Sequence, residues 1–287
     1  MVPLTGVYAD LLPKLQAVAT RLWRPTTWQH AGQLAWNSAF VDVPTPAAAW
    51  DDAAFGWLES PGCLELAVDP AQSRLVDDVV DWAVAHGAAS LTTTVTEADT
   101  ALVHGLVRRG FAIQDGPYFS QLILDLDHLP TMPPPTGYDV RAVHADELEA
   151  RAACHRAAWS DISPSSMTAE RYRRVTEAPS YRHELDVVVQ AGDGSLVASA
   201  LVWVAGEAAL VEPVGCVPAH RCRGLAGAAT LEALTAAREY GARLGLVRPR
   251  GDDAYPVPAR LYRALGFRPV TRSLTLVGPT SRDPEGS

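Results

Sequence analysis

The same order of strand, helix and turn signals occurs twice along the chain, and this repetition limits the fold more than any other feature. In the first copy the order is strand, helix, strand, short helix and strand, at residues 62–70, 76–84, 90–95, 101–109 and 119–126. The second copy repeats it at 208–217, 225–240, 244–247, 258–265 and 273–277. Each short helix is followed by a Gly-Phe pair, at Gly110 and Gly266. The pattern predicts two related α+β (α/β mixed) units, each a sheet flanked by helices.

A proline-rich segment separates the two copies. Residues 133–135 are three consecutive prolines, which neither a helix nor a central strand tolerates. A chain of 287 residues also suits two domains of about 140 residues each. We therefore expect a first domain at 1–127, a linker at 128–137 and a second domain at 138–287. In the second domain, a helix at 145–159 and antiparallel strands at 185–189 and 196–204 are expected before the repeated unit.

The two copies differ in the loop between their first strand and first helix. Pro70 precedes Gly87, which closes the helix, by 17 residues, whereas Pro218 precedes Gly241 by 23. The additional six residues lie in the second copy only. A function that requires a long strand-to-helix loop therefore belongs to the second half.

This loop, residues 218–227, has the features of an anion site. It follows a strand and opens a helix, whose first amides are unpaired and whose dipole favours negative charge. Gly224 allows a backbone bend, and Arg221 and Arg223 add positive charge. The loop has neither the Gly-Lys-Ser/Thr of a Walker loop nor the Gly-x-Gly-x-x-Gly of a dinucleotide site. It predicts a site for a pyrophosphate held by backbone amides.

These residues carry a family resemblance. Arg221-x-x-Gly224-x-Ala226 resembles the acyl-CoA motif of the GNAT superfamily of N-acetyltransferases, and Tyr262-x-x-x-Gly266 with the following phenylalanine resembles the next motif. The resemblance implies two tandem acyl-CoA N-acyltransferase-like domains, each with a central mixed sheet whose strands splay. It also implies acetyl-CoA as co-substrate, with pantetheine inserted between the fourth and fifth strands and the pyrophosphate on the loop. The residues then expected to contact acetyl-CoA are Gly215, Cys216, Val217, Arg221, Cys222, Arg223, Gly224, Leu225, Ala226 and Gly227.

The resemblance also implies two catalytic groups. Tyr262 matches a tyrosine that can protonate the leaving thiolate, although a packed aromatic side chain is the simpler interpretation. Glu212, on the strand that enters the site, is the candidate base, and water or His155 could take that role instead. The simpler interpretation of Glu212 is a side chain that faces solvent. Transfer would be direct, within a ternary complex. Cys216 and Cys222 lack a histidine and aspartate arrangement for a covalent intermediate.

Acceptor recognition is expected from the first helices of the second half. His155 and Trp159 share a helix face, and Tyr181 follows the second helix. A core tryptophan with a hydrogen-bonded histidine is the alternative. The acceptor would be an amine of a small molecule or peptide, which the sequence does not identify. Pro256 stands where many family members have asparagine, so an acyl-CoA-binding sensor without turnover remains a second hypothesis.

The first half lacks the features that would bind CoA. Residues 70–74 contain no glycine, and Leu106 occupies the position of the tyrosine. We expect a degenerate, structural half that covers a sheet edge or apolar surface of the second half and helps to shape the acceptor cleft. Six of the eight tryptophans lie in this half, and some are expected at the interface between the halves.

Composition excludes several other classes. A formal net charge of −9 argues against nucleic acid as a partner, and an apolar stretch at 196–211 is interrupted by Gly206-Glu207, which argues against a membrane span. Four cysteines give no disulfide framework, which suggests a cytoplasmic protein. Cys216, His220 and Cys222 lack a second ligand pair, so no metal is expected. A monomer or homodimer is expected.

Overall fold

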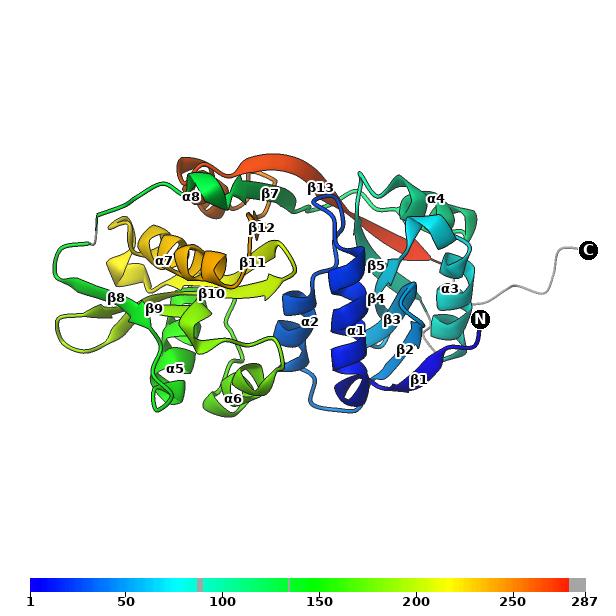
Figure 1. The fold of residues 1–287 in the computed structure, drawn as a ribbon, viewed down its shortest axis with the longest axis horizontal. Helices are drawn as coiled ribbons and strands as arrows, with labels where there is room; N and C mark the ends of the chain where they lie inside the picture. The colour runs from blue at the N-terminus through cyan, green and yellow to red at the C-terminus, as the bar shows by residue number, and fades with distance from the viewer. Residues whose placement is uncertain (87–89, 134, 279–287) are drawn as a thin grey trace, which may run out of the picture.

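The computed structural model describes residues 1–86, 90–133 and 135–278. One 13-stranded sheet runs along the elongated molecule, in the order β1-β2-β3-β4-β5-β13-β7-β12-β11-β10-β9-β8, with β6 paired to β13 (Figure 1). Gly87, expected to close a helix, and Pro134, expected in the linker, lie outside the described residues. So do residues 279–287 of the predicted second domain. The predicted mixed α and β architecture is confirmed.

The first half contributes β1 to β7 and four α-helices. The elements in chain order are β1 (Leu4–Val7), α1 (Tyr8–Leu22), α2 (Ala31–Ser38), β2 (Pro46–Trp50), β3 (Ala54–Ser60), β4 (Cys63–Val68), α3 (Leu75–Ala85), β5 (Leu91–Thr96), α4 (Thr100–Arg108), β6 (Ala112–Ile113) and β7 (Ser120–Asp125). The predicted strands and helices from β4 onward are found within two residues of their expected ends. The elements before β4 were not predicted.

The second half repeats the same order. Its elements are β8 (Tyr138–Ala142), α5 (Leu148–Trp159), α6 (Ala169–Glu177), β9 (Asp186–Ala191), β10 (Leu196–Ala205), β11 (Ala208–Cys216), α7 (Leu225–Glu239), β12 (Leu244–Val247), α8 (Val257–Ala264) and β13 (Arg268–Gly278). The last strand is longer than the predicted 273–277. The reason is that β13 serves both halves.

The last strands of the two halves are exchanged. β7 of the first half lies between β12 and β13, antiparallel to both, with Leu246 opposite Ile123. β13 pairs with β7 through its first residues and then with β5, from Ser273 opposite Thr96 to Gly278 opposite Leu91. Each half therefore completes its sheet with a strand from the other.

The exchanged strands also carry buried core side chains into the opposite half. Leu122 and Leu124 of β7 belong to the core cluster under α7 in the second half. Leu276 of β13 is fully buried in the core cluster of the first half, among residues of β4 and α3. Alternation places these leucines on the apolar side of whichever sheet they join. The two hydrophobic cores thus both depend on the exchanged strands.

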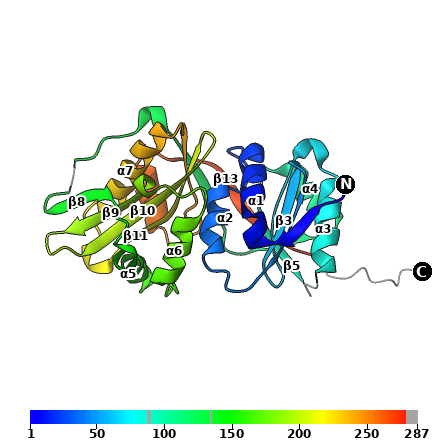
Figure 2. The same cartoon turned by 60° about the horizontal axis from the view of Figure 1, so that its bottom comes forward.

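Helix α2 fills the space between the two halves (Figure 2). It belongs to the first half but packs on β10 and β11, where a Cβ on Gly32 would stand only 2.1 Å from the Cβ of Trp203. Trp36 of the same helix is 9% exposed and joins a core cluster with Leu201 and Trp203. The prediction that first-half tryptophans are buried at the interface is confirmed. None of the described helices is both long and apolar enough to cross a membrane.

Residues 130–287 expressed alone are expected to fail to fold, because they lack β7. Losing Leu122 and Leu124 from the core alone removes about 2–5 kcal/mol for each leucine, against a typical total stability of about 5–15 kcal/mol. Circular dichroism and size-exclusion chromatography of the fragment test this. The control is the full chain cut at residue 130, whose two pieces should stay associated. A soluble fragment as stable as the full chain would refute the support role of the first half.

Candidate active site

Strands β11 and β12 diverge and open the sheet. Their parallel pairing covers Ala208 to Leu210 against Leu244 to Leu246, whereas β11 continues to Cys216. Beyond Leu210, the backbone edge of β11 that faces β12 has no strand partner among the described residues. The splay expected from the family resemblance is therefore confirmed.

A β-bulge in β11 lies where the splay begins. Ala200 pairs with Val214 and Val202 with Val211, so Glu212 and Pro213 together face one residue of β10. Val211 and Val214 consequently both contact the core under α7, although they are three residues apart. The indole Nε1 of Trp203 donates to the carbonyl oxygen of Glu212 at 2.8 Å. The bulge is thus held by the same tryptophan that packs on Gly32.

A cavity of about 670 Å³ opens beside the bulge and is lined by both halves of the chain. From the second half it receives four predicted site residues, His155, Trp159, Glu212 and Tyr262. The first half contributes Trp36, Phe40 and Phe119, which were not predicted as site residues. The other lining residues are Ile162, Ser163, Pro164, Ser165, Ser166, Val211, Pro213, Val214, Arg248, Pro249, Arg250, Tyr255 and Pro258.

Glu212 presents a carboxylate to this cavity. Its side chain is half-buried and has no hydrogen-bond or ion-pair partner within the described part of the chain. Burial raises the pKa of Glu212 above its ordinary value, and the Arg248 guanidinium opposes that shift. A carboxylate whose pKa is raised accepts a proton more readily than an exposed one.

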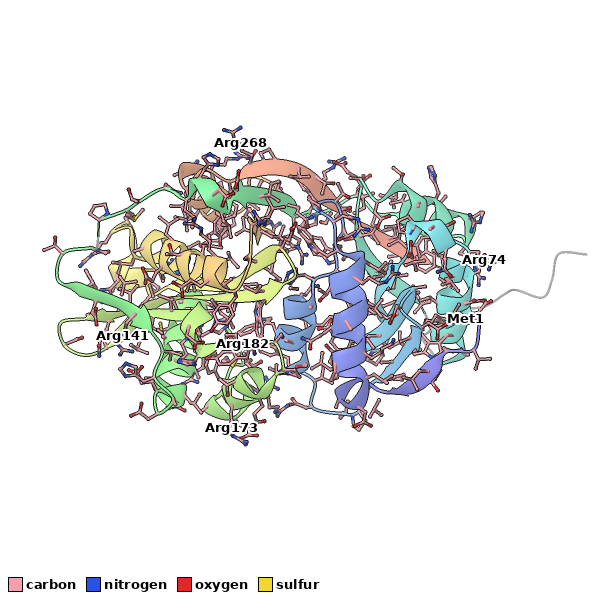
Figure 3. All side chains as sticks on the ribbon, viewed as in Figure 1. Met1, Arg74, Arg141, Arg173, Arg182 and Arg268 are labelled. Atoms are coloured by element: carbon pink, nitrogen blue, oxygen red, sulfur yellow. The ribbon has the colours of Figure 1, made fainter. Side chains whose placement is uncertain are left out.

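Arg248 is the charged neighbour of Glu212, and residues of the first half hold it. Its Nε donates to Oε1 of Gln121 at 3.1 Å, and its Nη1 donates to Oε1 of Gln33 at 2.5 Å. Its Nη2 donates to the carbonyl of Trp28, whose ring centre lies 4.4 Å from the guanidinium carbon. Burial lowers the pKa of Arg248 to about 10, so the group remains cationic at neutral pH. Arg268, by contrast, lies on the molecular surface (Figure 3).

Tyr262 lies on α8 and is 7% exposed. Its ring contacts that of Phe267 edge to face, with 5.6 Å between the centroids. Burial, with a smaller effect of Glu212, raises the pKa of Tyr262 well above its ordinary value. The hydroxyl therefore keeps its proton at neutral pH and can donate it. Pro256, the departure from the family pattern, is the N-cap of α8, and Pro258 lies in its first turn, where proline is tolerated.

The predicted acceptor residues divide into two groups. His155 and Trp159 line the cavity, with 6.0 Å between their ring centroids. Burial, then Arg151 and Arg156, lower the pKa of His155 to about 3, so its imidazole is a weak proton acceptor and a poor alternative to Glu212. Tyr181 does not line the cavity. Its hydroxyl instead donates to Oδ2 of Asp186 at 3.1 Å, beside a bond from Arg151 Nε to Oδ1 at 2.9 Å.

The predicted anion loop ends in a helix N-terminus that no side chain caps. Gly224 is the N-cap of α7 with φ of +78°, and no side chain caps the helix. Cys222 also has a positive φ, of +61°, so two left-handed residues turn the loop within three positions. The amides of Leu225, Ala226 and Gly227 begin the helix. A helix start with this geometry favours a phosphate group.

Arg221 and Arg223 have other partners around this loop. Arg221 makes two bonds to the Asp161 carboxylate, at 2.7 and 2.8 Å, and also donates to the carbonyls of Ala158 and Cys216 at 2.9 and 3.1 Å. It joins the loop to α5. Arg223 is exposed and donates to the Tyr138 hydroxyl at 2.7 Å. The charge of Arg221 is therefore largely balanced by Asp161 and less available to a phosphate than predicted.

Gly215 is required for close packing beside the splay. A Cβ there would stand 2.8 Å from the Cβ of Ala158 and 3.6 Å from Nε1 of Trp159. That indole N–H is buried and has no hydrogen-bond partner among the described residues. Any larger residue at 215 would push α5 away from β11.

The first half has a corresponding splay, but its own chain fills it. β4 and β5 pair only at Cys63 and Thr92. Residues 23–30, between α1 and α2 and here named the plug segment, lie against both strands, where Thr96 Oγ1 donates to the Thr26 carbonyl. Only about 190 Å³ remains between them.

In the first half, a side chain of the chain itself already binds an amide of the loop between β4 and α3. The carboxylate of Asp69 accepts from the Ala71 amide at 3.0 Å and from Arg21 at 2.7 Å. An anion that approached this loop would meet the Asp69 carboxylate, which already accepts from the Ala71 amide. These observations support the prediction that the first half does not bind CoA.

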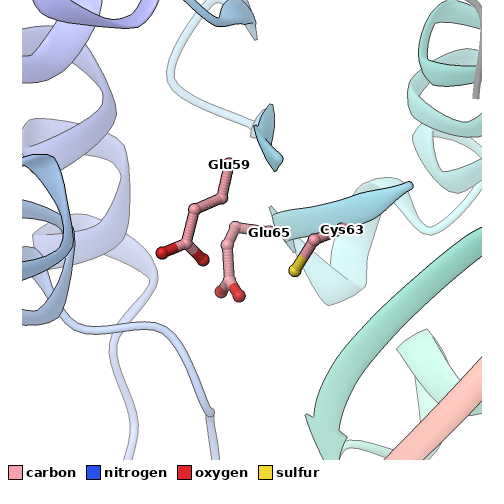
Figure 4. A group of neighbouring side chains, drawn as sticks. All are labelled: Glu59, Cys63 and Glu65. Carbon is pink, nitrogen blue, oxygen red and sulfur yellow. The ribbon is translucent and has the colours of Figure 1, made fainter. Parts of the chain in front are cut away.

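A second group of titratable side chains, Glu59, Cys63 and Glu65, lies in the first half (Figure 4). Their ligand-type atoms are all within 4.8 Å of one another. Burial, then Glu65, raise the pKa of Glu59 to about 7, and burial raises the pKa of Cys63 to about 12. Gln29 donates to Glu65. The thiol is therefore protonated at neutral pH, and the group carries less negative charge than its three members suggest.

Comparison with known proteins identifies the fold. No protein-family model and no curated protein sequence matches the chain. The fold is similar to that of a GCN5-related N-acetyltransferase from Sphaerobacter thermophilus, with 20% identity, a TM-score of 0.60 and coverage of 97% of this chain and 95% of the other. One from Kribbella flavida has 22% identity, a TM-score of 0.56 and coverage of 98% and 97%. A tandem GNAT protein from the clavulanic acid biosynthesis pathway has 17% identity, a TM-score of 0.62 and coverage of 99% of both chains. The chain therefore has the tandem fold of the GCN5-related N-acetyltransferases along its whole length, as the sequence motifs predicted.

Proposed function

We propose that the chain is an N-acetyltransferase that moves an acetyl group from acetyl-CoA to an amine, and that the site lies in the second half. The observation that carries this proposal is the splay between β11 and β12. It has a carboxylate and a buried tyrosine in the cavity at the bulge, and an uncapped, glycine-led helix N-terminus beyond the end of β11. The fold shared with acetyltransferases adds support.

Acetyl-CoA would be held by backbone groups. The unpaired edge of β11, from Val211 to Cys216, offers amides and carbonyls to pantetheine, and the first amides of α7 suit the pyrophosphate. Gly224 takes the positive φ that turns the loop into α7, and Gly215 lets α5 pack closely on β11. Most of the rate acceleration would come from holding the two substrates together in the cavity.

Glu212 and Tyr262 would move the protons. Glu212 accepts a proton from the acceptor ammonium, directly or through water, and leaves a neutral amine that attacks the thioester carbonyl. The C–S bond then breaks, and Tyr262 donates its hydroxyl proton to the leaving thiolate. The nitrogen loses its second proton to the resulting tyrosinate through water, which leaves an amide, a free thiol and a neutral phenol, and Glu212 returns its proton to solvent. A neutral phenol and an ionised carboxylate in one cavity are the protonation states that this sequence of steps requires.

Gly224→Glu is expected to abolish acetyl-CoA binding, because it places a carboxylate and a strained side chain at the phosphate position. Isothermal titration calorimetry measures the affinity. Gly192→Glu is the matched control, since it adds the same charge on an exposed turn where a Cβ meets no other atom. Equal binding by both variants would show that the loop assignment is wrong.

Tyr262→Phe is expected to lower kcat about 10²-fold with little change in acetyl-CoA affinity, because it removes the donated proton and keeps the ring. Release of free thiol measures turnover. Tyr240→Phe, at an exposed site on the far end of α7, serves as the control. Undiminished turnover in Tyr262→Phe would leave the tyrosine with a packing role only.

Glu212→Gln is expected to reduce kcat/KM most between the raised pKa of Glu212 and the pKa of the amine, where the carboxylate is ionised and the amine arrives protonated. Burial raises the pKa of Glu212, so wild-type activity should rise as pH increases through a value above the ordinary carboxyl range. The glutamine variant should lack this step and approach the wild type only where the amine is already neutral. Glu207→Gln, on an exposed turn, is the control. Superimposable pH profiles would exclude Glu212 as the base.

Acetyl-CoA binding without turnover of any amine would favour the sensor hypothesis over the enzyme. Mass spectrometry of ligands that co-purify with the chain would then identify what it senses.

A further inference from the structure

We propose that the acceptor is a small amine carried on a flat apolar body, an arylalkylamine, and that side chains of the first half select it. This inference rests on the proposed acetyl transfer, and concerns the cavity in which Glu212 lies. Its basis is the composition of the cavity wall, the charges already balanced within it and its size.

Aromatic rings dominate the wall. Six aromatic side chains line the cavity, and half of them come from the first half of the chain. They are Trp36, Phe40, Phe119, Trp159, Tyr255 and Tyr262. Flat rings bury large areas with few rotatable bonds, so such a wall favours a flat apolar ligand over a flexible or heavily hydroxylated one.

Several of these rings are fixed by one another. The rings of Trp36 and Phe40 have centroids 5.5 Å apart, and Trp36 lies 5.4 Å from the ring of His155, which in turn contacts Trp159. Phe119, at the mouth, lies 6.2 Å from Trp28 of the plug segment and is 43% exposed. An exposed phenylalanine at the edge of an aromatic cavity is available to cover a ligand.

The charges in the cavity favour an ammonium without an attached anion. Glu212 is the only acidic lining residue, and its carboxylate is unpaired among the described residues. Both lining guanidiniums already have partners, since Arg248 is bound by first-half acceptors and Arg250 Nε contacts Asp252 at 2.6 Å. Aromatic faces further stabilise an ammonium. A carboxylate or phosphate beside the amine would instead approach Glu212 without a free cation to balance it.

Two hydroxyl groups of the wall each accept one hydrogen bond from the chain itself. The Ser165 hydroxyl accepts from the Met167 amide at 3.2 Å, and the Ser166 hydroxyl accepts from Arg171. The neutral His155 ring packs between two tryptophans. A volume of about 670 Å³ lies within the range of about 300–1,000 Å³ found for small-molecule sites. The cavity therefore suits one small amine together with the acetyl-thioester end of the co-substrate.

The test compares four amines with the full chain and acetyl-CoA: phenethylamine, propylamine, phenylalanine and glucosamine. Phenethylamine should show the highest kcat/KM, by about 10-fold or more over propylamine, which lacks the ring, and over phenylalanine, which adds a carboxylate. Glucosamine should be the poorest acceptor or close to it. Equal or better turnover of phenylalanine, propylamine or glucosamine would overturn the acceptor assignment while leaving acetyl transfer intact.

The contribution of the first half is tested with Phe119→Ala, a change at an exposed position that should not impair folding. It should lower the ratio of kcat/KM for phenethylamine to that for propylamine about 5- to 10-fold. Val107→Ala, an equally exposed apolar residue of α4, is the control and should leave the ratio unchanged. An unchanged ratio in Phe119→Ala would refute selection by the first half.

A direct binding measurement distinguishes failure of the acceptor assignment from failure of the proposed acetyl transfer. Calorimetric titration with phenethylamine hydrochloride should show binding to the wild type and at least 10-fold weaker binding to Glu212→Gln. If phenethylamine binds in this way but no amine is acetylated, the acceptor cavity stands and the proposed acetyl transfer fails. If phenethylamine neither binds nor is acetylated, the acceptor assignment is overturned.

Discussion

A strand inside a sheet needs hydrogen-bond partners on both edges, and in this chain β12 and β5 each find one of theirs in the opposite half. β7 supplies the edge of β12, and β13 supplies that of β5. Because both exchanged strands also carry core leucines, the halves cannot rotate or separate without unpairing backbone and exposing apolar surface. The relative position of the halves is therefore fixed by the sheet, and a cavity between them can be as well defined as one within a single domain.

That fixed position allows the first half to support a site it does not itself contain. The plug segment fills the splay of the first half and also supplies the Trp28 carbonyl to Arg248. Gln121 of β7 holds the same segment through bonds to the Pro25 and Thr27 carbonyls at 2.7 and 3.0 Å. The residues that fill the splay of the first half thus also help to position Arg248 beside the cavity of the second half.

Much of the fold could be predicted from periodicity and turn residues, because most helices and strands after residue 62 are local patterns with clear ends. The short strands β6 and β8 were not predicted. The loop at Gly224 was also readable, since a positive φ at a helix start demands glycine. The strand exchange was not, because the apolar alternation at 120–125 satisfies either sheet equally well. Which sheet a strand joins depends on contacts that have no sequence signature.

The residues of the candidate site also divide into those that the sequence could predict and those that it could not. Glu212, Tyr262, His155 and Trp159 were proposed from motifs and helix spacing, and they line one cavity. Tyr181 was proposed only from its position after a helix, and its hydroxyl serves the buried Asp186 instead. Arg248 and the first-half aromatic residues could not be found, because they reach the cavity only through the packing of α2 and β7 between the halves.

The charge of Arg248, which is held by the first half, acts on Glu212 of the second half. A carboxylate moved from water into a half-buried site becomes harder to ionise, and a nearby cation partly restores its charge. Here no ion pair joins the two groups within the described residues, so Arg248 acts on Glu212 through its field and not through a bond. A direct bond would hold the carboxylate permanently charged and occupied, and so unable to receive an ammonium. By taking the donors of Arg248 with Gln33, Gln121 and the Trp28 carbonyl, the first half keeps the cation close while leaving the carboxylate open to a ligand.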